Sequence, residues 1–122
     1  PTQVRVIPVS ERFFAETEKI ARKIAMRNVR VDWDDRPLTM QKKVREAETE
    51  WVPYIVVVGR KEVESGILAV RDRRLSGAEK AGKIRKMNLK DLVDEIRERT
   101  EGKPFKPLTL PMALSRRPRF YG

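Results

Sequence analysis

Glu62 and Arg71 are side chains whose chemistry suits recognition of an unpaired guanine base. A carboxylate can accept hydrogen bonds from the N1–H and N2–H₂ donors of guanine, which are accessible when RNA is single-stranded. A guanidinium fork can donate to the O6 and N7 acceptors of the same base. Because Glu62 precedes a predicted strand that ends in Arg71, we expect both at one end of a sheet. On spacing alone a weak surface ion pair is favoured instead.

Positive charge is concentrated in two stretches of the chain. The 122 residues contain 28 Lys and Arg against 18 Asp and Glu, which gives a net charge of +10. Residues 71–90 carry +6 and residues 103–122 carry +5, so the rest of the chain sums to −1. A local excess of this kind is typical of a surface that binds a polyanion such as nucleic acid. A solvated basic hairpin followed by a loose tail would give the same counts.

Several classes of active site are excluded by the residues that the sequence lacks. The chain contains no cysteine and no histidine, which removes thiolate nucleophiles, Cys/His zinc sites and a histidine general base. No glycine-rich phosphate-binding motif is present. No apolar stretch approaches the ~20 residues of a membrane span, and the first residues do not resemble a signal peptide. We therefore expect a cytoplasmic protein without catalytic residues in this chain.

Asp32, Asp34 and Asp35 cluster where the second predicted strand ends. Carboxylates in such a position could hold Mg²⁺ in a flavodoxin-like enzyme that binds a small phosphate ligand. A magnesium site of this kind also requires acidic residues after the first strand, and residues 8–10 include none. A loop of solvated acids with local hydrogen bonds is the alternative, and we predict no metal site.

Hydrophobic periodicity predicts eight elements in the order β-α-β-α-β-β-β-α. Strands are expected at residues 3–9, 29–33, 54–58, 67–70 and 83–87. Helices are expected from Ser10 to about Arg27, from Pro37 to the region of Trp51, and from the N-cap Asn88 to Gly102.

These elements define the expected fold and its boundaries. The first three strands are joined by helices and should therefore be parallel, whereas the later strands follow short connections and can pair antiparallel. The predicted fold class is α/β, with a mixed five-stranded sheet flanked by three helices in three layers and an irregular C-terminal tail. The predicted domain covers residues 1–102, and residues 103–122 form a basic, proline-rich tail packed on it or extending from it.

Three stretches together resemble the C-terminal anticodon-binding domain of class II aminoacyl-tRNA synthetases. They are QVRVIP at 3–8, residues 29–36 with the helix that follows, and VPYIVVVGRKEVESGILAVR at 52–71. The last stretch most resembles threonyl-tRNA synthetases, and the tail resembles their archaeal-type versions. The resemblance implies a domain that binds the anticodon loop of threonine tRNA and supports ATP-dependent threonylation by an upstream catalytic domain. ATP, magnesium and zinc are then expected only in that other domain, and no cofactor in this one.

The same resemblance implies a set of RNA-contacting residues. Glu62 and Arg71 match the glutamate and arginine that contact anticodon bases. Threonine anticodons share a middle guanine, which suits this pair. The expected contacts to the RNA backbone or loop are Arg36, Lys43, Arg45, Arg73 and Arg74.

Three alternatives remain open at this point. The chain could belong to a prolyl, glycyl or histidyl synthetase, which share the fold. It could be a free-standing accessory protein of that fold, acting without tRNA charging. The flavodoxin-like enzyme with acids at 32–35 is the third. On the favoured interpretation the partners are threonine tRNA and the rest of the synthetase chain, with no membrane partner.

Overall fold

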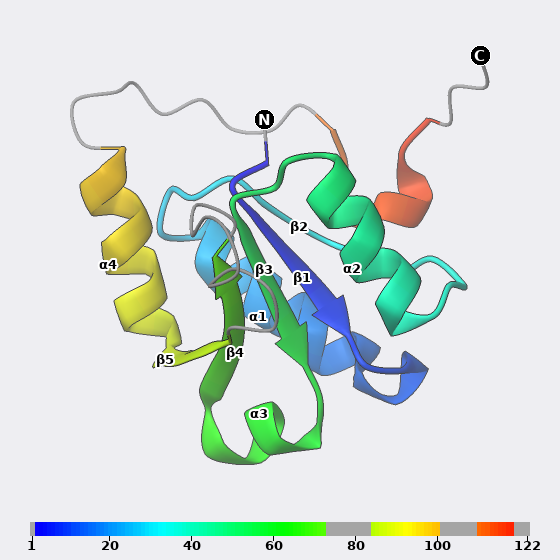
Figure 1. Ribbon diagram of the computed structural model, residues 1–122, viewed down its shortest axis with the longest axis horizontal. Coiled ribbons are helices and arrows are strands. Elements are labelled where there is room, and N and C mark those ends of the chain that lie inside the picture. The colour runs from blue at the N-terminus through cyan, green and yellow to red at the C-terminus, as the bar shows by residue number, and fades with distance from the viewer. Residues whose placement is uncertain (1, 73–83, 101–109, 119–122) are drawn as a thin grey trace.

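A computed structural model of the chain contains one mixed sheet with helices on both faces (Figure 1). The structure describes residues 2–72, 84–100 and 110–118. The strands are β1 (Val4–Pro8), β2 (Val31–Trp33), β3 (Tyr54–Val58), β4 (Ile67–Asp72) and β5 (Arg85–Asn88). They form a five-stranded sheet in the order β2-β1-β3-β4-β5. The predicted α/β class and sheet are confirmed.

The sheet has a parallel half and an antiparallel half, as the connection lengths predict. β1 lies between β2 and β3 and is parallel to both. β3 pairs antiparallel with β4, and β4 pairs antiparallel with β5. The helices α1 (Phe14–Ala25) and α2 (Met40–Thr49) provide the two crossovers of the parallel half. A parallel pair requires such a long connection because the chain must return to the starting edge.

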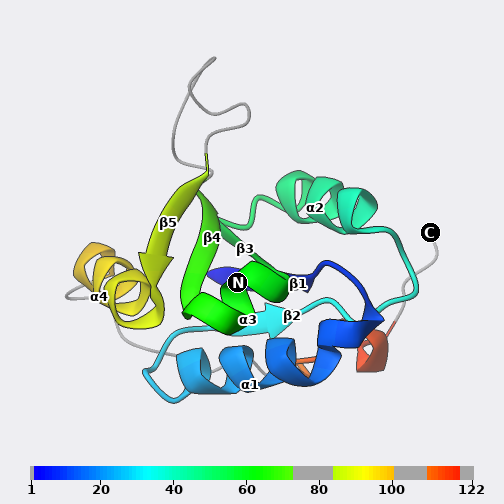
Figure 2. The same cartoon turned by 90° about the horizontal axis from the view of Figure 1, so that it is seen from below.

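The helices cover the two faces unequally (Figure 2). α1 and α4 (Leu89–Arg99) pack on one face, where β1, β3 and β4 contribute the main hydrophobic core. Of the helices in the described part of the chain, only α2 packs on the other face, where Val44 and Ala47 meet Ile7 and Ile55. Each fully buried aliphatic side chain contributes about 1.5–3 kcal/mol relative to an exposed one. Burial against helices therefore fixes β1 and β3 from both sides.

A fourth helix, α3 (Arg60–Ser65), is not among the elements predicted from the sequence. It connects β3 to β4 at the end of the sheet (Figure 1). Gly66 ends it with a φ of 75°, a left-handed conformation that glycine adopts without steric cost. Its six residues include no buried side chain, so hydrophobic periodicity gives no signal for it. The three predicted helices flank the sheet, and α3 adds a cap at one end.

Several helix boundaries differ from the predictions. Thr39, rather than Pro37, begins α2, because its side chain accepts a hydrogen bond from the Lys42 amide at 3.2 Å. α2 ends at Thr49, and Trp51 is 73% exposed with a φ of 62°, so it is not part of the buried helical face. The predicted Asn88 cap of α4 is confirmed by its 2.7 Å bond from the Asp91 amide. α4 ends at Arg99, and the expected stop at residue 102 lies outside the described residues.

Part of the C-terminal tail packs along the free edge of β2. The Trp33 amide donates to the Met112 carbonyl at 3.0 Å, and Trp33 forms a parallel bridge with Ala113. A short 3-10 helix, η3 (Leu114–Arg116), follows and buries Leu114. Among the described residues, no helix has the length and apolar character needed to cross a bilayer.

Candidate nucleic-acid interface

The antiparallel half of the sheet presents a face that no described helix covers. Leu68 and Val70 of β4 point into the main core beneath α1 and α4. Because successive strand residues point to opposite faces, Ala69 and Arg71 lie on the α2 side. Lys86 of β5 pairs with Ala69 in register, and its side chain is exposed. We call the face formed by Val57, Ala69, Arg71 and Lys86 the open face.

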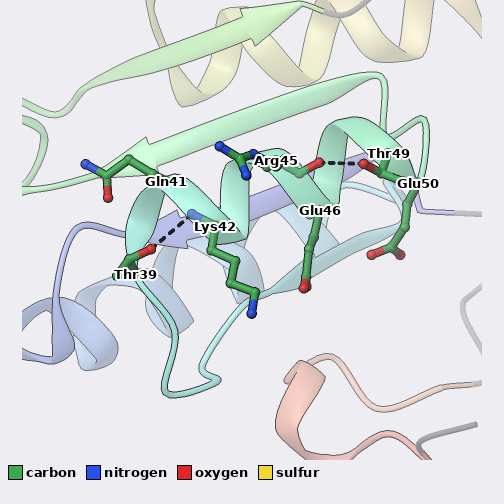
Figure 3. A pocket seen from close by; sticks show the side chains of 7 residues that line it. All are labelled: Thr39, Gln41, Lys42, Arg45, Glu46, Thr49 and Glu50. Carbon is green, nitrogen blue, oxygen red and sulfur yellow. Dashed lines mark hydrogen bonds between the residues drawn. The ribbon is translucent and has the colours of Figure 1, made fainter. Parts of the chain in front are cut away.

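One flank of α2 borders the open face. Glu46, on the other flank, pairs with Arg36 in the loop that follows β2. Since β2 and β4 lie on opposite sides of β1 and β3, the flank that carries Gln41, Arg45 and Glu48 is turned toward β4. Figure 3 shows Gln41 and Arg45 on the side of α2 away from Lys42 and Glu46. Arg45 is exposed, as expected for an RNA contact.

Arg71 is half-buried on the open face, with one donor that has no partner among the described residues. It pairs in register with Ile55, near the start of β3. Its Nε is buried and makes no hydrogen bond to any described residue. A buried unsatisfied donor is unfavourable by about 1–3 kcal/mol, so a ligand that supplies an acceptor gains this energy back. The Nε of Arg71 is therefore a donor that a ligand with a hydrogen-bond acceptor could satisfy.

Glu62 lies at the start of α3, and its carboxylate is fixed on the same face as Arg71. The Gly59 amide donates to Glu62 Oε1 at 2.7 Å, which caps the helix. Gly59 continues the extended backbone of β3, so a Cβ there would point to the same face as Val57. That Cβ position lies only 3.2 Å from Glu62 Oε1. The carboxylate therefore lies at the edge of the open face.

The predicted placement of Glu62 and Arg71 at one end of the sheet is wrong. Glu62 follows the last residue of β3, whereas Arg71 lies beside Ile55 at the opposite end of the β3–β4 pair. The strand from Ile67 to Arg71 spans about 13 Å at ~3.3 Å per residue. The two side chains lie on the same face of the sheet but at opposite ends of it, with the small side chain of Ala69 between them. Glu62 comes before β4 and Arg71 lies near its end, so the length of the strand itself separates them.

Gly59→Ala should destabilise the domain and displace Glu62. The added methyl group would lie 2.9 Å from Val9 Cγ2, which is closer than van der Waals contact allows. We expect urea denaturation to show a free energy of unfolding lower by about 1–3 kcal/mol, as for other overpacked sites. Adding Val9→Ala should recover part of the loss, because it removes the opposing methyl group. Equal stability of Gly59→Ala and the wild type would contradict the tight packing.

Two predicted contacts to the RNA backbone are engaged within the protein: Lys43 is buried, and Arg36 is partly exposed but paired with two carboxylates. Lys43 is 3% exposed; its Nζ donates to the Asp34 carbonyl at 3.0 Å and lies over the Phe14 ring. Burial lowers the pKa of Lys43. The placement of Lys43 near the RNA backbone is therefore wrong. Arg36 bonds to Asp34 at 2.7 Å and to Glu46 at 2.6 Å, and its hydrogen bond to Asp34 raises its pKa.

Two predicted contacts cannot be placed, and two residues that were not predicted belong to the candidate interface. Arg73 and Arg74 lie outside the described residues. Lys86, which is part of the open face, and Gln41, on the flank of α2 beside it, are not among the contacts predicted from the sequence. The alternating pattern of β5 could have identified Lys86, because Met87 packs against the core and its neighbour must then point away.

The acidic cluster at 32–35 is engaged in internal contacts. Asp32 bonds to Arg5 and Arg117, and Asp34 bonds to Arg36. Asp35 accepts two hydrogen bonds from Ser115. Among the described residues, no group of three His, Cys, Asp or Glu is arranged to hold a metal ion. These carboxylates serve as partners for cations and hydroxyl groups of the protein itself.

Comparison with known proteins identifies relatives of the whole chain. Residues 3–99 match the family described as anticodon binding domain. The chain is 49% identical over 122 residues to a threonine–tRNA ligase from Pyrococcus horikoshii, of which it covers 19%. It is 48% identical over 120 residues to the threonine–tRNA ligase of Methanosarcina mazei, of which it covers 18%. The chain thus spans about a fifth of the length of these curated relatives.

Solved structures share the fold at lower sequence identity. The RNA-binding domain of threonyl-tRNA synthetase from Cryptosporidium parvum superposes with a TM-score of 0.71 at 21% identity, covering 88% of this chain and 24% of that one. Histidyl-tRNA synthetase from Nostoc superposes with a TM-score of 0.68 at 19% identity, covering 81% of this chain and 22% of that one. With the sequence match over residues 3–99, these findings show that the chain belongs to the anticodon-binding domain family of aminoacyl-tRNA synthetases.

Proposed function

We propose that this domain binds the anticodon loop of threonine tRNA and contributes affinity and identity to threonylation carried out elsewhere in the protein. The observation that carries the proposal is the buried Nε of Arg71, which has no hydrogen-bond partner among the described residues and lies on a face that no described helix covers. Relatives at 48–49% identity are threonine–tRNA ligases, which favours threonine tRNA over other tRNAs. ATP, magnesium and zinc chemistry would belong to the rest of that protein, in the cytoplasm.

The open face suggests how one base is held. A guanine lying over Ala69 would have Arg71 at one side and Glu62 at the other. Arg71 would donate to its O6 and N7, and the free Glu62 oxygen would accept from N1–H and N2–H₂. Glu62 Oε1 is already bonded to the Gly59 amide, so its orientation is fixed before the base arrives. Such preorganisation lowers the entropy lost on binding.

A panel of transcribed tRNAs tests the proposal directly. Filter binding of the 122-residue chain should show tightest binding for threonine tRNA, with weaker binding for proline, glycine and histidine tRNAs. Tightest binding to one of those three would assign the chain to that synthetase instead, which the fold of the histidyl relative allows. Equal binding to all four would leave only non-specific phosphate contacts.

Lys86→Ala should reduce the salt dependence of tRNA binding. Lys86 is exposed on the open face, where we expect it to contact an RNA phosphate. Removing one cation that contacts a phosphate should flatten the slope of log K against log salt by about 0.7–0.9. Lys19→Ala is the matched control, because Lys19 is exposed on α1, which packs on the other face of the sheet. An equal change of slope in both variants would mean that the cations act only through net charge.

A further inference from the structure

The segment 110–118, which we call the clasp, is attached to the protein at several points. Its backbone extends the sheet at Trp33, and Leu114 is buried to 9% exposure. Met112 and Ala113 pack against the main core. Figure 2 shows η3 beside the loop that joins β2 to α2. The described part of the tail is thus a packed element of the domain.

Ser115 of the clasp holds the loop that leads into α2. Its amide donates to Asp35 Oδ1 at 2.7 Å, and its hydroxyl donates to Asp35 Oδ2 at 2.5 Å. Both oxygens of one carboxylate are therefore fixed by a single residue. Hydrogen bonds to a charged group are stronger than those between neutral groups. Asp35 precedes Arg36, which in turn bonds to Glu46 of α2.

Arg117 of the clasp reaches the other end of α2 through a chain of ion pairs. Its side chain is 14% exposed and bonds to the fully buried Asp32 at 2.9 Å. Asp32 bonds to Arg5 at 2.9 Å, and Arg5 bonds to Glu50 at 2.8 Å. Glu50 is the C-cap residue that directly follows α2. The two positive and two negative charges of this chain of ion pairs balance only when Arg117 is included.

We propose that Ser115 and Arg117 are positioning residues that set the place of α2 beside the open face without touching RNA. The clasp is linked to the loop before α2 by Ser115 and to its last turn by Arg117. α2 carries Gln41 and Arg45 on the flank that is turned toward β4, so a shift of the helix moves both. The proposal rests on the proposed function of that face. It gives the clasp, the described part of the basic tail, a role within the protein.

Ser115→Ala tests the positioning role, because Ser115 is exposed and its replacement leaves the core intact. Well below the melting temperature, we expect affinity for threonine tRNA to fall about three- to tenfold with an unchanged salt slope, since the number of phosphate contacts stays the same. Ser115→Thr keeps the hydroxyl group and should restore affinity. A merely structural role would lower the melting temperature without changing affinity under these conditions.

Hydrogen exchange provides a readout that does not depend on RNA. In Ser115→Ala we expect faster exchange at the amides of Lys42 and Lys43, which bond to Thr39 at the start of α2. The Asp91 amide, capped by Asn88 in α4, should be unchanged and serves as the internal control. Unchanged exchange at all three amides would overturn the positioning role of the clasp.

The outcomes separate this inference from the proposed function. A salt slope flattened by about 0.7–0.9 in Arg117→Ala would show that Arg117 contacts phosphate, which overturns the inference. Unchanged affinity in Ser115→Ala overturns it as well. If the wild-type chain shows no preference among tRNAs, the proposed function fails, while the exchange measurement still decides whether the clasp holds α2.

Discussion

Arg71→Ala should weaken binding of threonine tRNA and should also reduce discrimination against a changed middle anticodon base. A bidentate contact between arginine and guanine provides about 1–3 kcal/mol of discrimination, which corresponds to roughly 5- to 150-fold. The Arg71 side chain makes no hydrogen bond through its buried Nε within the described residues. The melting temperature should therefore change little, and the effect should appear in binding alone.

Two further variants separate base recognition from charge. Arg71→Lys keeps the positive charge but lacks the planar fork, so we expect reduced discrimination with the salt slope retained. Arg22→Ala removes an equivalent charge from α1, where Arg22 is 69% exposed and bonded to Glu18. This control should leave discrimination unchanged. If Arg71→Ala reduces binding equally for the cognate tRNA and for the tRNA with the changed base, Arg71 contacts only phosphate.

The sheet is predictable from the sequence because its signals are local. The β-branched run of β3 is buried on both faces, as its uninterrupted apolar character indicates. Asn88 is recognisable as a helix cap because Asp91 stands three residues later. The start of α2 is not settled in this way, since Pro37 and Thr39 are both residues that begin helices. Only the hydrogen bond from Lys42 to Thr39 decides between them.

The candidate site is harder to predict, because it depends on contacts between distant residues. Lys43 is expected from its charge to point outward, yet it shares the buried face of α2 with Ala47 four residues later. The helical spacing contains that signal, although a lysine at a buried position is unusual. The partnership of Arg117 with Asp32 has no local signal at all, since many residues separate them in the chain. From their charge alone, Lys43 and Arg117 would both be expected at the surface.

The separation of Glu62 and Arg71 could have been predicted, because Glu62 precedes β4 and Arg71 lies near its end, and an extended strand holds its two ends apart. The sequence does not show that both side chains lie on one face, since that depends on how α3 orients Glu62. α3 has no apolar periodicity from which it could be found, and its only apolar side chain, Val63, is 40% exposed. The type of each residue is informative, whereas their mutual geometry requires the structure.

Asp32→Asn should cause the largest loss of stability of any substitution considered for this domain. The Asp32 carboxylate is fully buried and accepts bonds from Thr2 at 2.8 Å, from Arg5 and from Arg117. Burial opposes the charged form of Arg5, but its bonds to Asp32 and Glu50 outweigh this and raise its pKa. An asparagine amide would remove the negative charge that both guanidinium groups require.

The expected loss is about 3–5 kcal/mol, because removing one partner leaves the other charge buried without compensation. The melting temperature should then fall by roughly 10–20 °C, which calorimetry of the whole chain can measure. Glu18→Gln is the matched control: it also neutralises a carboxylate bonded to an arginine, but the Glu18 and Arg22 side chains are 42% and 69% exposed. An exposed pair of this kind contributes at most about 1 kcal/mol. Similar losses in both variants would mean that water reaches Asp32, and that the ionic chain from the clasp to α2 does not hold the two together.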